Sequence, residues 1–364
     1  MKKYRLAILC NFGPPHVGGT EQVLENISTR LISECKYNIT IFGYNYKKKE
    51  VYKGINLCPC YKGQQLIDQI SKFDHILTYS DSFWGFDTLV ENIDKVDCRI
   101  SVALVGAYHM QSHPEILLIL KKNLHKINLI THSSLTCDYK WCIDNNLPVK
   151  VIPNGVNMAE FEKSEIDIRE KYNIKEKYIF LNVSNFFFGK GFEILPKIAR
   201  KIRSKDFIIL QFSNTVHYPY DKVFFNRTKN QCKGLPVKFI RDAPREDTIS
   251  AFKQSDSFIF TSKKEIAPLV ILESRAAKLP WISMNVGNTI ESLGGKVINN
   301  PKEDHKGYKI VDDKIINSYI VNIVEILELK EIREKIIDQG QEGIESIDWD
   351  NIVPLYDKVF MDEI

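Results

Sequence analysis

Short apolar runs alternate with amphipathic segments along most of the chain. YRLAILCNF at residues 4–12 predicts a buried strand, and TEQVLENISTRLISE at 20–34 predicts a helix. Val23, Ile27 and Leu31 fall on one face of that helix, and another apolar run follows it. Strands that are joined by helices in this way are typical of an α/β protein whose parallel sheet is covered on both faces.

The alternation stops once and then restarts, which indicates two domains. Residues 156–177 are charged and helical in pattern, and strand-like runs then resume with YIFLNVSN. A chain of 364 residues is long enough to bury two cores. We therefore predict Rossmann-like domains at 1–157 and 158–345, each with its own parallel sheet, and a final amphipathic helix within 346–364. The domains are expected to face each other across a cleft, with ligands beyond the carboxyl ends of the strands.

Composition excludes some functions and favours a reducing compartment. A net charge of +4 argues against a protein that coats nucleic acid. The chain has 8 cysteines, and the pairs Cys58/Cys60 and Cys137/Cys142 lack the spacing of a zinc site. We expect free thiols in the cytoplasm, with a metal site as the alternative. The start, MKKYRLAILCNFGPP, predicts a buried strand rather than a signal peptide, and no apolar run reaches the ~18–20 residues of a membrane span.

Two glycines follow the first predicted strand. Gly18 and Gly19 in NFGPPHVGGTEQ let the backbone approach a ligand, and the next helix begins with free N–H groups that suit an anion. A loop that needs glycine only for its own geometry is the alternative. The fingerprint G-x-G-x-x-G is absent, which argues against a nicotinamide site.

A lysine stands in a glycine-flanked loop after the first strand of the second half. In NVSNFFFGKGFEILPKIARKI, Lys190 immediately precedes Gly191 and the next predicted helix. A lysine in that place can meet a phosphate as a point charge. A solvated surface lysine is the alternative.

Two glutamates flank a short apolar run in EIAPLVILE. Pro268 fits the first helical position, so Glu265 lies in the preceding loop and Glu273 more than a turn into the helix. The free amides of Leu269 and Val270 would hold a diphosphate between the two carboxylates, each of which would bind different hydroxyls.

A second interpretation of the two glutamates needs no ligand. Glu265 would then neutralise Lys263 or Lys264, and Glu273 would pair with Arg275 or another nearby base.

Taken together, these motifs resemble glycosyltransferase family 4, the retaining, sugar-nucleotide-dependent enzymes of the GT-B fold. The resemblance covers nearly the full chain. GGTEQ looks like the family's glycine loop, and VIPNGVN looks like its interdomain strand. NVSNFFFGKGF resembles the family's G-R-L-x-x-x-K-G segment, and VGNTIESL resembles its V-G-G-x-x-E loop. SKKEIAPLVILESRAAKLPWIS resembles the E-x7-E motif together with the elements that follow it.

The resemblance implies a role for each matching residue. Glu265 would contact hydroxyls of the transferred sugar, Glu273 would bind the ribose, and Lys190 would neutralise the diphosphate. Gly18 and Gly19 would line the cleft. The donor would be a nucleotide-diphosphate sugar of UDP or GDP type, and no cofactor or metal would be required. A donor phosphate oxygen would take the acceptor proton, so no dedicated protein base would be needed.

The resemblance also implies domain roles. The first domain would bind the acceptor and the second the nucleotide sugar, and the final helix would pack back on the first domain, as Trp349 suggests.

Several positions depart from the family pattern. Asn185 stands where the family has a phosphate-binding arginine, unless Arg241 or Arg245 substitutes. Pro268 replaces a glycine and removes one amide donor. The family's catalytic-side histidine ends a strand in the first domain, and His109 is the candidate here.

The acceptor is a saccharide, a lipid-linked molecule or another hydroxyl compound. PEILLILKKNLHKI at 114–127 carries Lys121, Lys122 and Lys126, and could rest on the inner face of an anionic membrane or simply cover the sheet. The basic loop at 44–53 could meet a phosphate-rich or nucleic-acid acceptor, although a solvated loop is favoured.

Three other functions compete with glycosyl transfer. A sugar-nucleotide epimerase could share the architecture, and a non-catalytic binding module is compatible with Asn185 and with Val105 at the expected histidine position. A dehydrogenase is the weakest, since its glycine fingerprint is missing.

Overall fold

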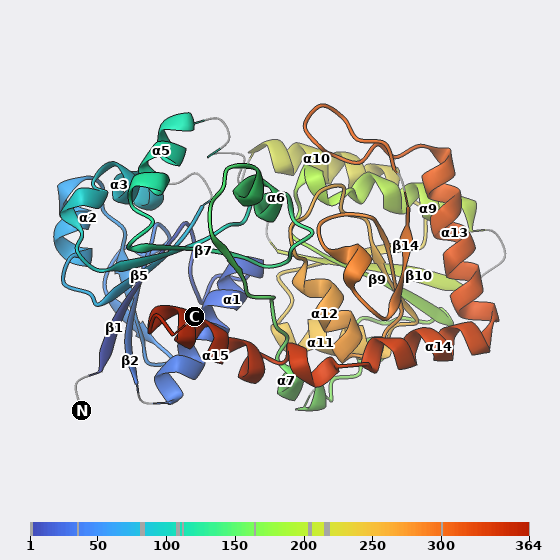
Figure 1. Cartoon of the computed structure of the whole chain (residues 1–364). Helices are drawn as coiled ribbons and strands as arrows, with labels where there is room; N and C mark the ends of the chain where they lie inside the picture. Colours follow the sequence, from blue (N-terminus) through green and yellow to red (C-terminus); the bar gives the residue numbers. More distant parts are fainter. Residues whose placement is uncertain are drawn as a thin grey trace. The chain divides into compact units, whose positions relative to one another are not determined.

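The computed structural model describes residues 3–34, 36–80, 84–106, 110, 113–163, 165–202, 206–214, 219–299 and 301–363. The chain forms two compact units (Figure 1). Unit 1 comprises Met1–Gly155 together with Trp349–Ile364, and unit 2 is the continuous segment Val156–Asp348.

Unit 1 is built on an eight-stranded sheet with the order β3-β4-β2-β1-β5-β6-β7-β8. Its neighbouring strands are parallel except for β3, which runs antiparallel to β4. The strands are β1 Tyr4–Cys10, β2 Tyr37–Gly43, β3 Glu50–Tyr52, β4 Ile55–Pro59, β5 His75–Tyr79, β6 Arg99–Ala103, β7 Ile127–Thr131 and β8 Val149–Val151.

The helices of unit 1 follow the strands, as expected for parallel pairing, which needs crossover connections. They are α1 Gly19–Ser33, α2 Gln64–Ile70, α3 Trp84–Glu91, α5 Pro114–Lys122, α6 Cys137–Asp144 and α15 Trp349–Phe360, with a 3₁₀ turn at Ile93–Lys95.

The C-terminal helix α15 belongs to unit 1, and it lies beside α1 (Figure 1). The Tyr37 hydroxyl donates to Asp357 over 2.5 Å, and Arg30 pairs with Asp350. At the start of α15, the buried Trp349 packs so closely on Gly155 that a Cβ there would lie 2.7 Å from the indole ring. Glycine is therefore required at residue 155.

One segment of unit 1 was predicted wrongly. The basic stretch 44–53 was expected to be a loop, but Glu50–Tyr52 forms β3 and pairs with Ile55–Pro59 of β4 through a tight turn at Lys53 and Gly54. Strands this short carry too few alternating residues to be recognised in a basic context. Pairing with a neighbour decides such a strand.

Unit 2 is built on a six-stranded, fully parallel sheet with the order β11-β10-β9-β12-β13-β14. Every residue of β10 is buried, which is the expected pattern for a strand covered on both faces. The strands are β9 Tyr178–Val183, β10 Phe207–Ser213, β11 Val237–Arg241, β12 Ser257–Phe260, β13 Trp281–Met284 and β14 Gly295–Ile298.

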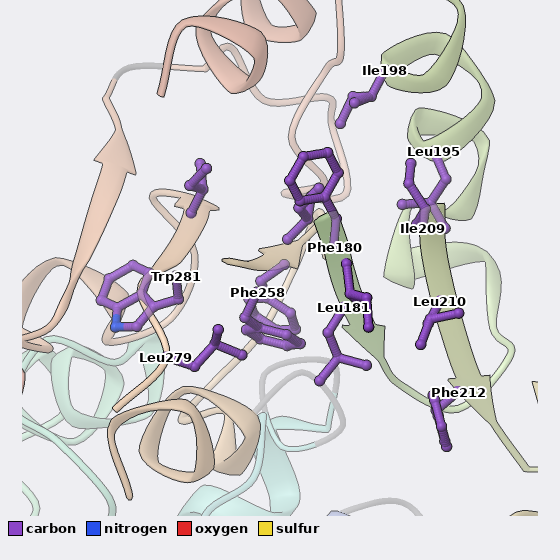
Figure 2. Close-up of a cluster of buried hydrophobic side chains, with 14 of the residues drawn as sticks. Phe180, Leu181, Leu195, Ile198, Ile209, Leu210, Phe212, Phe258, Leu279 and Trp281 are labelled. Atoms are coloured by element: carbon purple, nitrogen blue, oxygen red, sulfur yellow. The ribbon is translucent and has the colours of Figure 1, made fainter. Parts of the chain in front are cut away.

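Helices cover this sheet and complete its core. Figure 2 shows Phe180 and Leu181 of β9, Leu210 of β10 and Phe258 of β12 gathered in the core, with Leu195 of α9 beside them. The helices are α7 Met158–Lys163, α8 Ile168–Lys171, α9 Leu195–Lys201, α10 Pro219–Gln231, α11 Arg245–Gln254, α12 Leu269–Ala276, α13 Asp313–Glu328 and α14 Lys330–Gln341. The 3₁₀ turns are Phe188–Lys190, Phe192–Ile194, Thr289–Glu291 and Ile344–Ile347.

The predicted fold class is confirmed, because both units are α/β structures built on parallel sheets. The cysteines that the structure describes are free thiols. None of the described helices is long and apolar enough to cross a membrane.

Candidate functional site

Most of the predicted site residues belong to unit 2, where they lie on loops at the carboxyl edge of the sheet or in helix α12. The loop after β9 carries Lys190, the loop after β12 carries Glu265, and the loop after β13 contains Gly287. Parallel strands place the loops that follow them at one edge, where open sheets bind their ligands.

Lys190 and Glu265 form an ion pair. The Lys190 Nζ donates to Glu265 Oε1 over 2.7 Å, and the two side chains are 27% and 12% exposed. The pair is therefore screened from bulk water but remains open on one side. Lys190 is thus not a solvated surface lysine.

A second ion pair joins the same two loops with the charges reversed. Lys263 Nζ donates to Glu193 Oε1 over 2.7 Å, so here the loop after β12 supplies the cation. Lys263 is almost fully buried, and its Nζ lies 3.7 Å from the centre of the Phe188 ring, which is a cation–π contact. The backbone adds a bond from the Lys263 amide to the Gly189 carbonyl over 2.8 Å. These contacts hold the Lys190 loop against the Glu265 loop.

Two glycines permit the close approach of these loops. Gly191 has a φ of +67°, and a Cβ there would lie 2.1 Å from the Thr261 carbonyl oxygen. Gly287 has a φ of +55°, and a Cβ there would lie 2.3 Å from the Ile266 carbonyl oxygen. Only glycine satisfies both the backbone conformation and the space at these positions.

Helix α12 starts beside Glu265. Its first residue is Leu269, and Pro268 is the N-cap with extended backbone, so the prediction of Pro268 at the first helical position was wrong by one residue. Pro268 has no side-chain capping bond, and the first intrahelical bond comes from Ile271. The amides of Leu269 and Val270 precede that bond and belong to the helix end that favours negative charge.

Glu273 is buried in α12 and is bound by an arginine. Arg245 lies 2.6 Å from Glu273 Oε1 and 3.1 Å from Glu160 Oε2, so one guanidinium bridges two carboxylates. Burial lowers the pKa of Arg245, but the two carboxylates outweigh burial and raise it. Arg245 therefore stays charged and fixes the position of Glu273.

The ion pairs show which charged partners the two glutamates have. Glu265 pairs with Lys190, whereas Lys263 pairs with Glu193 and Lys264 donates to the Lys306 carbonyl. The pairings of Glu265 with Lys263 or Lys264 were therefore wrong.

Arg275 is also not the partner of Glu273, since it donates to the carbonyls of Gly340 and Glu342. The alternative, that Glu273 pairs with a different basic residue, is confirmed, because Arg245 is that residue.

The structure shows the contacts of Asn185 and of the two arginines that were considered as substitutes for the family's phosphate-binding arginine. The Asn185 side-chain oxygen accepts a 3.0 Å bond from Asn214, which follows the neighbouring strand β10. Arg241 is exposed and stacks over Phe225, while Arg245 is held by its carboxylates. Neither arginine bonds to Asn185 among the described residues.

Three site predictions belong to unit 1. Gly18 is the N-cap of α1 and Gly19 its first residue, at the carboxyl end of β1. His109 lies outside the described residues.

Sequence reasoning missed the residues that hold the site in place. Glu160 and Glu193 are ordinary surface-type residues in charged segments, and Lys263 entered only as a partner for Glu265. Their partners lie about 70 to 85 positions away in sequence, so local spacing could not identify them.

The arrangement combines groups suited to an anion with groups suited to hydroxyls. Lys190 and the first amides of α12 can accept negative charge, and the carboxylate of Glu265 can accept hydrogen bonds from hydroxyl groups. Among the described residues, no group of three or more His, Cys, Asp or Glu side chains could hold a metal ion.

Comparison with known families finds a match in the second unit. Residues 164–343 match the family model "Glycosyl transferases group 1". This segment of unit 2 is therefore similar to the glycosyl transferases of group 1. All of the residues in the two loop-joining ion pairs, together with α12, fall inside the matched segment.

Solved structures extend the likeness to the whole chain. Sucrose-phosphate synthase from Thermosynechococcus elongatus superposes with a TM-score of 0.76 at 15% identity, over 99% of each chain. HepE from Anabaena, solved with UDP-glucose, gives 0.76 at 13% identity, over 98% of this chain and 99% of that one. The chain therefore has the GT-B fold.

A curated relative matches part of the chain. It is the alpha-monoglucosyldiacylglycerol synthase of Streptococcus pneumoniae, 27% identical over 161 residues. The match spans 41% of this chain and 34% of the relative's length. Membership of family 4, retention of configuration and the residue roles stay predictions.

Proposed function

We propose that this protein is a retaining glycosyltransferase that moves a sugar from a nucleotide-diphosphate donor to a hydroxyl acceptor. The observation that carries the proposal is the Lys190–Glu265 pair beside the uncapped start of α12, inside the segment that matches the glycosyl transferases of group 1. The pair offers a cation and a carboxylate at one place, which matches a donor that carries a diphosphate and sugar hydroxyls next to each other.

The donor can replace the ion pair without leaving either partner unsatisfied. Lys190 would turn from Glu265 to a diphosphate oxygen, and Glu265 would accept bonds from the sugar hydroxyls. The amides of Leu269 and Val270 would meet the same diphosphate. Glu273, fixed by Arg245, would accept bonds from the ribose.

The transfer exchanges one bond to the anomeric carbon for another. The bond from that carbon to the diphosphate oxygen breaks, and the diphosphate leaves with the electron pair. The acceptor oxygen bonds to the carbon on the same face, and its proton passes to a donor phosphate oxygen. Lys190 and the amides of α12 stabilise the charge that develops on the leaving diphosphate.

UDP is the nucleotide that we favour. HepE was solved with UDP-glucose, and a trehalose-6-phosphate protein from E. coli with UDP-2-fluoro glucose, both with the GT-B fold of this chain. GDP remains the alternative.

For the acceptor we favour a lipid-linked or glycolipid hydroxyl over a free saccharide. The support is the partial match to a synthase of a glycosyldiacylglycerol and the surface of α5. Ile116 and Leu120 of α5 are buried, whereas Leu118 is 69% exposed beside the exposed Lys121 and Lys122. Vesicle flotation tests this proposal. Failure of the protein to float with anionic vesicles at low salt would exclude membrane binding.

The test of catalysis is the release of UDP from UDP-glucose with a lipid acceptor. We expect Lys190→Ala to lower kcat by about 100-fold or more, because the mutant lacks a cation that acts on the leaving group. Lys197→Ala removes an exposed lysine of α9 and is the matched control. Unchanged turnover of every accepted donor in Lys190→Ala would contradict the role of Lys190.

A nucleotide-sugar-binding module without transfer is the second candidate. It is favoured by Asn185, which supplies no positive charge, and by the engagement of Glu273 with Arg245 and Glu160. Calorimetry that detects UDP-glucose binding, with neither transfer nor hydrolysis, would support the module. Conversion of donor alone to another nucleotide sugar would instead indicate an epimerase.

A further inference from the structure

Unit 1 contains a cavity of about 640 Å³ on one face of its sheet, between strands β2 and β4 and helix α2. Asn38, Thr40 and Phe42 alternate along β2, so they face the same side of the sheet. Gln69 of α2 and the following Lys72 line the cavity as well. The volume falls within the ~300–1,000 Å³ of sites that hold small molecules.

The cavity runs along β2 and β4 on one face of the sheet, as far as Phe42 and Cys58 near the ends of these strands. It reaches the amino ends of the strands, because Arg5 is the second residue of β1 and Phe73 comes just before β5. The Gly18 and Gly19 loop at the carboxyl end of β1 does not line it. A molecule in the cavity therefore has no contact with the Gly18 and Gly19 loop.

The charge of the lining favours an anion. Lys49 and Lys72 have no ion-pair or hydrogen-bond partner within the described ranges of the chain. Burial raises the pKa of the Cys58 thiol, and both lysines oppose that rise, so their charges act on the same point of the lining. Among the described lining residues the only carboxylate is Glu50, which lies 3.7 Å from Lys48.

Arg5 adds no free charge to the lining. It donates to both carboxylate oxygens of Asp74, at 3.1 and 2.7 Å. The two lysines are thus the groups available to an anion.

The remaining lining favours a ring that carries hydroxyl groups. The Oε1 atom of Gln69 is buried and has no hydrogen-bond partner in the part of the chain that the structure describes. A buried acceptor of this kind is costly unless a donor reaches it, and a ligand hydroxyl would be such a donor once the Gln69 side chain turns toward the cavity. Phe42, Leu57 and Phe73 supply an apolar wall for the face of a ring.

We propose that this cavity is a second binding site, and that its ligand is a phosphorylated sugar. The phosphate lies between Lys49 and Lys72, a hydroxyl donates to Gln69, and the ring rests on the apolar wall. The inference goes beyond the proposed transfer and does not depend on it.

Isothermal calorimetry on the full chain tests the site with glucose 6-phosphate, glucose and orthophosphate as separate probes. We expect saturable binding of glucose 6-phosphate, with each of the other two at least about tenfold weaker, because each lacks half of the contacts. Equal affinity for orthophosphate would overturn the sugar part, and equal affinity for glucose would overturn the phosphate part. Absence of saturable binding of all three would overturn the site.

Variants locate the binding. Lys49→Met with Lys72→Met is expected to weaken glucose 6-phosphate binding about tenfold or more, since bonds to charged groups are the stronger class. Lys121→Met with Lys122→Met changes the net charge equally on α5, outside the cavity, and is the control. An equal loss in both double variants would show that only the overall charge matters and would contradict the site.

Cys58 gives a second readout, because it lines the cavity. We expect saturating glucose 6-phosphate to slow alkylation of Cys58 by N-ethylmaleimide at least about fivefold, as measured by peptide mapping. Cys98 does not line the cavity and serves as the internal control. An unchanged Cys58 rate at saturation would place the ligand elsewhere.

Discussion

Lys190 and Glu265 satisfy each other in the free protein, and this has a consequence for ligand binding. A donor has to replace a 2.7 Å ion pair with bonds of its own. A ligand with only an anion would leave Glu265 without its cation, and a ligand with only hydroxyls would leave Lys190 without its anion. Since each unpaired, partly buried charge is costly, the pair selects for a ligand that carries both groups.

A buried histidine in unit 1 makes a separate residue-scale prediction. His75 is fully buried, and its Nε2 lies 2.9 Å from the Ser101 hydroxyl. Burial, together with the charge of Arg99, lowers the pKa of His75 from 6.5 to about 3. Below pH 6.5 His75 binds a proton in the unfolded state, whereas in the folded state it binds one only below about pH 3. Stability therefore falls as the pH is lowered through that window.

We expect His75→Gln to flatten this dependence. In the parent protein, His75 contributes a slope of up to about 1.4 kcal/mol per pH unit to the free energy of unfolding, from pH 6.5 down to the lowest pH at which the protein folds. The variant should lose this contribution. Urea unfolding at several pH values measures the slope. The exposed His305→Gln is the control and should leave the slope unchanged. A slope in His75→Gln equal to that of the parent protein would contradict the assignment.

At the scale of elements, the site depends on how tightly the loops after β9, β12 and β13 are joined. Two ion pairs and a backbone hydrogen bond join the loops after β9 and β12, and each loop supplies the lysine of one pair. Two glycines allow the backbones of the loops to approach closely. The loops can thus present Lys190 and Glu265 with little freedom, which reduces the ordering cost of binding a ligand.

Gly191→Ala tests this joining of loops. We expect it to reduce the free energy of unfolding by at least about 2 kcal/mol. An alanine would be strained in the left-handed backbone conformation of this position, and its Cβ would clash with the Thr261 carbonyl oxygen. Gly234→Ala is the matched control: its φ is +76°, and no atom lies within 4 Å of the added Cβ. It should cost only the strain, about 1 kcal/mol. Thermal and urea unfolding measure both. Equal losses would show that the loop contact at Gly191 carries no energy.

At the scale of the whole molecule, the two units differ in how the chain builds them. Unit 2 is one continuous segment, Val156–Asp348, with its own sheet and core. Unit 1 needs two separate segments, because α15 returns to it from the far end of the chain. The helix buries six large side chains against unit 1: Trp349, Ile352, Val353, Tyr356, Val359 and Phe360.

This difference predicts how fragments behave. We expect residues 156–348 to fold alone with a cooperative thermal transition, and residues 1–155 to fold stably only when a peptide of residues 349–364 is added, since that peptide covers an apolar surface. Circular dichroism melts measure both, with a scrambled peptide as the control. A cooperative melt of 1–155 without the peptide, at the temperature reached with it, would contradict the role of α15.

The sequence predicted the parallel-sheet elements well and the contacts of the site only in part. Long apolar runs such as FIILQFS specify strands by themselves, because a fully buried strand has to be apolar along its whole length. Three-residue β3 carries too little pattern, and its antiparallel pairing with β4 decided it.

By itself the sequence determined most of the alternating strands and helices, the α/β class, and the position of Lys190, Glu265 and α12 after their strands, since periodicity and glycine or proline signals are local. Only the tertiary structure decided that Lys190 faces Glu265, that Lys263 faces Glu193, and that Arg245 bridges Glu273 and Glu160. The physical reason is that an ion pair depends on distance in space, and residues some 70 positions apart meet only when parallel strands bring their loops to one edge of the sheet.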